Sequence, residues 1–83
     1  MQDLQRGDIV EISWKDHFRY SADRPEEMIV KSWGQVDDFS EDGIGIVQNE
    51  VQNSEEAKAD RVLDGQFILI HNIISVKILA GNR

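Results

Sequence analysis

The chain has 83 residues, no cysteine and a formal net charge of −7 at pH 7. A chain of this length builds one small core, so we expect a single domain over residues 1–83. The lack of cysteine excludes disulfides and thiol chemistry. Because no apolar run reaches the roughly 18 residues of a membrane span and no signal peptide is recognisable, we expect a cytoplasmic protein with no membrane partner.

The negative charge is concentrated in the middle of the chain. Residues 35–65 hold nine acidic and two basic side chains, whereas residues 1–34 and 66–83 are together neutral. Any phosphate-binding face should therefore be built from the two ends of the chain. The acidic middle is expected to be either a solvated surface or a binding surface for a basic protein partner.

The first strand is predicted at Asp8–Trp14, directly after a glycine-containing turn signal. Within it Val10, Ile12 and Trp14 alternate with polar residues, which is typical of a strand with one buried face.

The segment Lys15–Met28 breaks the alternation, and we expect a short helical turn in it, capped by Asp23 and with Pro25 near its start. A second, long strand is predicted at Ile29–Phe39. Gly34 in its middle indicates a bulge or a sharp bend, which a small barrel needs where one strand serves both halves of the sheet.

A hairpin signal, Asp42-Gly43, leads into a third strand at Gly43–Val51, with Ile44 and Ile46 on one face. The following segment Gln52–Gly65 lacks strand character. Residues 53–63 are predicted to be either a short helix or an acidic loop, and Asp64-Gly65 a turn.

The densest apolar run is Gln66–Leu79. We interpret it as two short strands joined in a hairpin by a tight corner at His71-Asn72. Both faces of the first strand are apolar, so it should be covered on both sides, while Ile74, Val76 and Ile78 form the buried face of the second. The predicted fold is all-β, a five-stranded SH3-like or Sm-like barrel with a long bent second strand and a terminal strand–corner–strand hairpin.

Two stretches resemble the Sm-like family. LIHNIISVKIL (residues 69–79) is similar to the second Sm motif and to the corresponding step of the bacterial Hfq RNA chaperones. VKSWGQVDDFSEDGIGIVQNEV (residues 30–51) has the apolar spacing and central glycine of the first motif. The layout also resembles small uncharacterised prokaryotic and phage barrel proteins. The resemblance implies barrels that assemble into homo-oligomeric rings and bind RNA. The turn at residues 38–42 lacks the Met-Asn of the family's base pocket, and Ile70 stands where Hfq has lysine.

An enzyme is not expected, because two histidines and scattered carboxylates give no nucleophile, base and orienting group in a recognisable pattern. His17 and His71 lack the ligand spacing of a zinc site, so neither a metal nor another cofactor is expected.

Aromatic and cationic residues interleave in WKDHFRY, residues 14–20, as single-stranded nucleic-acid binding requires. The alternative is that Trp14 and Phe18 close the end of the barrel. His71 either contacts a base or fixes the corner by bonding to backbone, and Trp33 is expected in the core or in a subunit interface. The candidate nucleic-acid-binding residues are Lys15, His17, Phe18, Arg19, Tyr20, His71, Asn72 and Lys77.

The leading hypothesis is a non-enzymatic Sm-like barrel that forms a homo-oligomeric ring and binds nucleic acid, with single-stranded RNA preferred over single-stranded DNA. The alternative is a protein-binding SH3-like module of phage or mobile-element origin, whose acidic surface binds a basic protein. Salt dependence and the residues on which binding depends distinguish the two.

Overall fold

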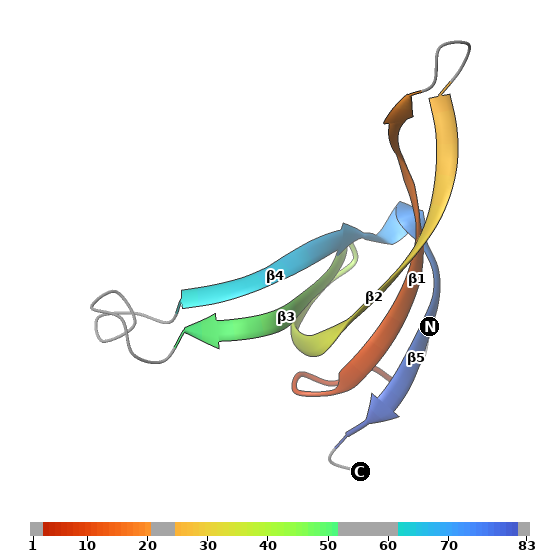
Figure 1. Cartoon of the computed structure of the whole chain (residues 1–83). Helices are drawn as coiled ribbons and strands as arrows, with labels where there is room; N and C mark the ends of the chain where they lie inside the picture. Colours follow the sequence, from red (N-terminus) through yellow and green to blue (C-terminus); the bar gives the residue numbers. More distant parts are fainter. Residues whose placement is uncertain (1–2, 21–24, 52–61, 82–83) are drawn as a thin grey trace.

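The computed structural model describes residues 3–20, 25–51 and 62–81. Five strands, β1 to β5, and one short 3-10 helix, η1, form a single antiparallel sheet in the order β4-β3-β2-β1-β5 (Figure 1). The elements are β1 (Ile9–Tyr20), β2 (Pro25–Phe39), β3 (Gly43–Val51), β4 (Val62–Leu69), η1 (Ile70–Asn72) and β5 (Ile73–Ala80). The prediction of an all-β chain with five strands is confirmed. No helix among the described residues is long and apolar enough to cross a membrane.

Strands β1 and β2 are longer than predicted. Their pairing continues past a register shift between Asp16 and Arg19 to the pair Tyr20 and Pro25. The helical turn predicted at Pro25 is therefore wrong, because the antiparallel partner strand holds this segment extended; its predicted cap, Asp23, lies outside the described residues. The two strands form an arm that diverges from the β3–β4 arm (Figure 1). The radius of gyration is accordingly 15.0 Å, against about 12 Å for a compact domain of this length.

The bend of β2 allows this divergence. β2 pairs with β1 as far as Gln35 and with β3 from Gln35 onward, and Figure 1 shows it curving sharply there. A Cβ on Gly34 would lie 2.9 Å from the carbonyl oxygen of Val47 and 3.1 Å from the Cβ of Ile46, so β3 comes this close only to a glycine. The predicted bend is confirmed, while the bulge lies between Val36 and Asp38.

One face of the sheet, here called the inner face, carries the core. The alternation predicted for Val10 and Ile12 and for Ile44 and Ile46 is confirmed, and these four side chains are almost fully buried. The other buried apolar residues are Leu4, Val36 and Ile68, and Trp14, Ile73, Val76 and Ile78 pack against the cluster. The indole N–H of Trp14 donates to the Ser32 hydroxyl at 2.9 Å, which satisfies both groups below the surface.

The terminal strands are not a hairpin, and this part of the prediction is wrong. β4 pairs with β3 and β5 pairs with β1, so the two strands are the opposite edges of a sheet that is not closed into a barrel. η1 joins them with only three residues because the curvature of the sheet brings the ends of the two edges together at this corner (Figure 1).

β4 also begins earlier than predicted. Asp64-Gly65 is not a turn but part of this strand, with Gly65 opposite Val47, where an added Cβ would collide with the Ile46 carbonyl. Its outer side is not covered, because Phe67 and Leu69 are about half exposed, while Ile68 between them is buried. A helix or a loop is predicted at residues 53–63. Val62 and Leu63 belong instead to β4, and residues 53–61 lie outside the described part of the chain.

In β5 a register shift opposite Ser13 and Trp14 changes which residues face the core. Ile73 packs against the core with Val76 and Ile78, whereas Ile74, predicted to be buried, is 50% exposed. The shift adds a residue to β5, so the residues of β5 before it, including Ile73, lie on the opposite side from the one that simple alternation predicts.

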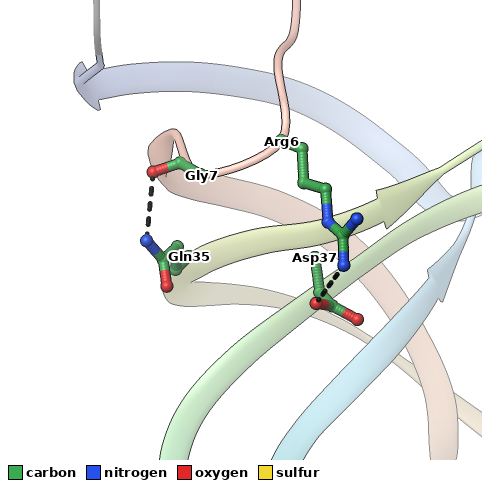
Figure 2. A network of polar contacts seen from close by, with 4 residues as sticks. All are labelled: Arg6, Gly7, Gln35 and Asp37. Carbon is green, nitrogen blue, oxygen red and sulfur yellow. Dashed lines mark hydrogen bonds and ion pairs between the residues drawn. The ribbon is translucent and has the colours of Figure 1, made fainter.

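The chain before β1 fastens the bend of β2. The Asp8 N–H donates to the Gln5 carbonyl, and Gly7 has a φ of 95°, the conformation that type II turns require at their third residue. The Gly7 N–H then donates to the Val36 carbonyl and the Val36 N–H to the Asp8 carbonyl, both at 2.8 Å. Figure 2 shows two further contacts of this turn, an Arg6–Asp37 ion pair at 3.6 Å and a hydrogen bond from Gln35 to the Gly7 carbonyl.

Candidate nucleic-acid interface

The outer face is the face of the sheet opposite the core. Lys77 of β5, Glu11 of β1 and Trp33 of β2 lie directly opposite one another across three strands. Ser75, Ser13 and Lys31 form the next row, and Lys15 follows on β1. All three lysines are exposed. Since Glu11 is the only carboxylate in these two rows, this half of the outer face carries a local positive charge on an acidic protein.

Glu11 holds two of its neighbours on this face. Its Oε2 accepts a hydrogen bond of 2.9 Å from the Trp33 indole N–H, and its Oε1 lies 3.8 Å from the Lys31 ammonium. Trp33 is 52% exposed in this chain. The expectation that Trp33 lies in the core is therefore wrong, while a subunit interface stays a prediction.

Trp33 lines a shallow depression of about 420 Å³ at the point where β2 changes partner. The apolar part of its lining comes from Ile9, Trp33 and Val47 together with Gly34. The polar part, here called the rim, comes from β2 and β3 and consists of Gln35, Gln48, Asn49 and Glu50. Among the described residues, no lysine or arginine lines the depression.

The three amides of the rim are anchored through their NH₂ groups. Gln48 donates to the Trp33 carbonyl at 3.0 Å, Gln35 to the Gly7 carbonyl at 3.3 Å, and Asn49 to the Asp64 carboxylate at 3.2 Å. Each partner is a carbonyl or a carboxylate, which can only accept a hydrogen bond. The amide must therefore present its NH₂ group and not its oxygen to that partner. Within the described parts of the chain, the oxygens of these three amides accept no hydrogen bond.

Of the predicted binding residues of β1, the structure describes the side chain of Lys15 only. Lys15 is exposed and lies on the outer face. His17 and Phe18 lie within the register shift of β1 and Arg19 and Tyr20 beyond it, and the side chains of all four lie outside the described part. Lys77 shares the outer face with Lys15, so these two predicted cations lie on one surface.

The sequence reasoning missed Lys31 on that surface. The alternation of Ile29, Lys31 and Trp33 with Val30 and Ser32 is the signal that could have placed it there.

The corner is held by the backbone and not by His71. The Ile70 N–H donates to the Asp42 carbonyl at 2.8 Å, and the Ile73 N–H donates to the Ile70 carbonyl. His71 is exposed and, among the described residues, its ring makes no hydrogen bond; the interpretation that it fixes the corner is wrong. Asn72 is half-buried beside it. The described residues contain no group of three metal-ligating side chains.

Comparison of the chain with family models, with curated proteins and with solved structures found no match.

Proposed function

We propose that this chain is the subunit of a homo-oligomeric Sm-like ring that binds single-stranded nucleic acid, RNA in particular, without acting as an enzyme. The observation that carries the proposal is the strand order, which leaves β4 and β5 as two different open edges on one curved sheet. Sheet edges present unpaired backbone N–H and carbonyl groups, which pair readily with another chain.

Both edges carry exposed apolar side chains that water solvates poorly. Phe67 and Leu69 on β4 are 53% and 54% exposed, and Ile74 and Leu79 on β5 are 50% and 48% exposed. Pairing β5 of one subunit with β4 of the next would bury these residues and extend the sheet. Because the two edges differ, this contact is head-to-tail, and it closes into a ring when the rotation per subunit divides a full turn. Edge pairing would complete the barrel architecture across subunits.

Nucleic-acid binding is supported by the outer face. Lys15, Lys31 and Lys77 are spaced over three neighbouring strands, as contacts to successive phosphates require, and Trp33 offers a stacking surface beside them. His71 and Asn72 at the corner and His17, Phe18, Arg19 and Tyr20 in the β1 arm extend the proposed surface on the ground of sequence.

Native mass spectrometry at micromolar concentration tests the assembly. The wild type should be a closed oligomer of several subunits, and Phe67→Lys or Leu79→Lys should shift it to monomers, because a charge then replaces an apolar edge contact. Ile29→Lys is the matched control. Ile29 is 60% exposed but lies on β2, the central strand of the sheet and not an edge strand, so this variant should assemble like the wild type. A wild type that is only a 9.5 kDa monomer would contradict the ring.

One observation favours the second candidate, a protein-binding module. Asp38 near the end of β2 and Glu41 and Asp42 in the turn that follows are all exposed, and a basic protein segment would fit these carboxylates. Replacing these three with Asn or Gln should abolish capture of a basic partner and should leave nucleic-acid binding unchanged or slightly stronger. If nucleic acid is not bound and the acidic turn alone supports binding, the second candidate replaces the first.

A further inference from the structure

We propose that Glu11 competes with the nucleic acid for Lys31, and that the Lys31 ammonium exchanges this carboxylate for a phosphate when a strand binds. This inference rests on the proposed nucleic-acid binding and names the residue that limits its strength.

Glu11 lies among the cationic and aromatic side chains of the outer face. It is directly opposite Trp33 on β2 and Lys77 on β5, and Lys31 is its diagonal neighbour across the β1–β2 ladder, within reach of a long side chain. Trp33 and Lys31 both contact its carboxylate. In the chain alone, the anion that these two side chains meet is therefore the protein's own.

The two contacts of the carboxylate differ in kind. The indole N–H of Trp33 donates to Oε2 at 2.9 Å, an ordinary hydrogen-bond length. The Lys31 ammonium lies 3.8 Å from Oε1, which is beyond hydrogen-bonding distance. The side chain of Lys31 is 57% exposed and that of Glu11 only 23%. Because an exposed ion pair of this kind is weak, Lys31 is the partner that can leave, while Glu11 stays bonded to Trp33.

Lys77 provides the contrast on the same face. It lies directly opposite Glu11, yet among the described residues its ammonium makes no ion pair. A phosphate that binds Lys31 must replace a carboxylate, and no described carboxylate has to be replaced at Lys77. The attraction that Lys31 loses offsets part of the attraction that it gains, so Lys31 adds less to the affinity than its charge alone would allow.

A double-mutant cycle tests the exchange, with affinities measured by fluorescence anisotropy of a labelled single-stranded RNA decamer at one low salt concentration. Glu11→Gln removes the charge and keeps an oxygen that can accept from the Trp33 indole. We expect this variant to bind about two- to fivefold more tightly than the wild type, the range that corresponds to one exposed ion pair. The substitution is isosteric and lies on the surface, so the melting temperature should be unchanged.

Two lysine backgrounds separate the exchange from general repulsion of the strand by a carboxylate. In Lys31→Gln, adding Glu11→Gln should change the affinity by less than about 1.5-fold, because the cation under competition is absent. In Lys77→Gln, the two- to fivefold gain should remain. Glu41→Gln removes an equal charge from the exposed turn after β2 and controls for net charge, so it should give no comparable gain.

An equal gain from Glu11→Gln with and without Lys31 would overturn the exchange, since the carboxylate would then repel the strand from a distance; the proposed function would stand. Weaker binding by Glu11→Gln would also overturn it and would show that the carboxylate supports binding through Trp33. If neither the wild type nor Glu11→Gln binds the decamer, the exchange and the proposed function are both overturned.

Discussion

Replacing Gly34 with alanine tests the bend of β2, on which both the divergence of the two arms and the depression at Trp33 depend. The added Cβ would lie 2.9 Å from the Val47 carbonyl oxygen and 3.1 Å from the Ile46 Cβ. The first contact is with backbone, so β3 must move away as a unit and part of the β2–β3 packing must loosen. Such overpacking costs about 1–3 kcal/mol, which for a domain of this size lowers the melting temperature by roughly 4–20 °C.

Gly45→Ala is the matched control on the neighbouring strand. The nearest atom to its added Cβ would be Phe67 Cδ2 at 3.5 Å, an ordinary contact. Removing a glycine from a strand reduces the conformational freedom of the unfolded chain, so Gly45→Ala should be neutral or more stable by about 0.5–1 kcal/mol. Thermal and urea unfolding followed by circular dichroism, at one fixed protein concentration, measures both variants. If Gly34→Ala unfolds at or above the midpoint of Gly45→Ala, the close packing of β2 on β3 is refuted.

Three further substitutions give graded expectations for the free energy of unfolding, each measured by urea denaturation. Ile46→Ala removes a side chain that is 1% exposed and should cost about 2–5 kcal/mol, whereas Ile29→Ala, at 60% exposure on β2 and away from both sheet edges, should cost under about 1 kcal/mol; similar losses would contradict the assignment of the inner face. Gly7→Ala forces an L-residue into a φ of 95° and should cost about 1–2 kcal/mol, and no loss would argue against the turn that fastens β2. Arg6→Ala removes an ion pair of 3.6 Å whose arginine is 72% exposed, so a loss above about 1 kcal/mol would be unexpected.

The strands that the sequence predicts well are those with local signals. β3 begins and ends where predicted, because Asp42-Gly43 defines its start and the alternation of Ile44 and Ile46 defines its faces. β4 was predicted too short, since the polar sequence around Asp64-Gly65 is typical of a turn and only pairing with β3, far along the chain, keeps it extended. Long-range pairing also decides that β4 and β5 lie at opposite edges, which no property of residues 66–79 encodes.

The candidate site was predicted in part for a similar reason. Lys15 and Lys77 were chosen for their charge, and the sheet places both on the outer face. Trp33 is expected from the sequence in the core or in a subunit interface, and strand alternation excludes the core: it places Trp33 with Lys31 on the outer face, because Ser32 is the residue that turns inward to meet Trp14. The rim of the depression combines residues of β2 and β3 that become neighbours only through the bend at Gly34.

The most direct test of the central claim is the salt dependence of binding to a labelled single-stranded RNA decamer. The wild type should bind with a dissociation constant below about 100 µM at low salt, and affinity should fall as salt rises. The double variant Lys31→Gln, Lys77→Gln should bind more weakly, and its slope of log affinity against log salt should be smaller by about 1.4, the value for two lost phosphate contacts on a single strand. Arg6→Gln, which removes a cation of the N-terminal turn, should change neither quantity. An unchanged slope in the double variant, or no binding by the wild type at low salt, would contradict the claim that the outer face binds nucleic acid.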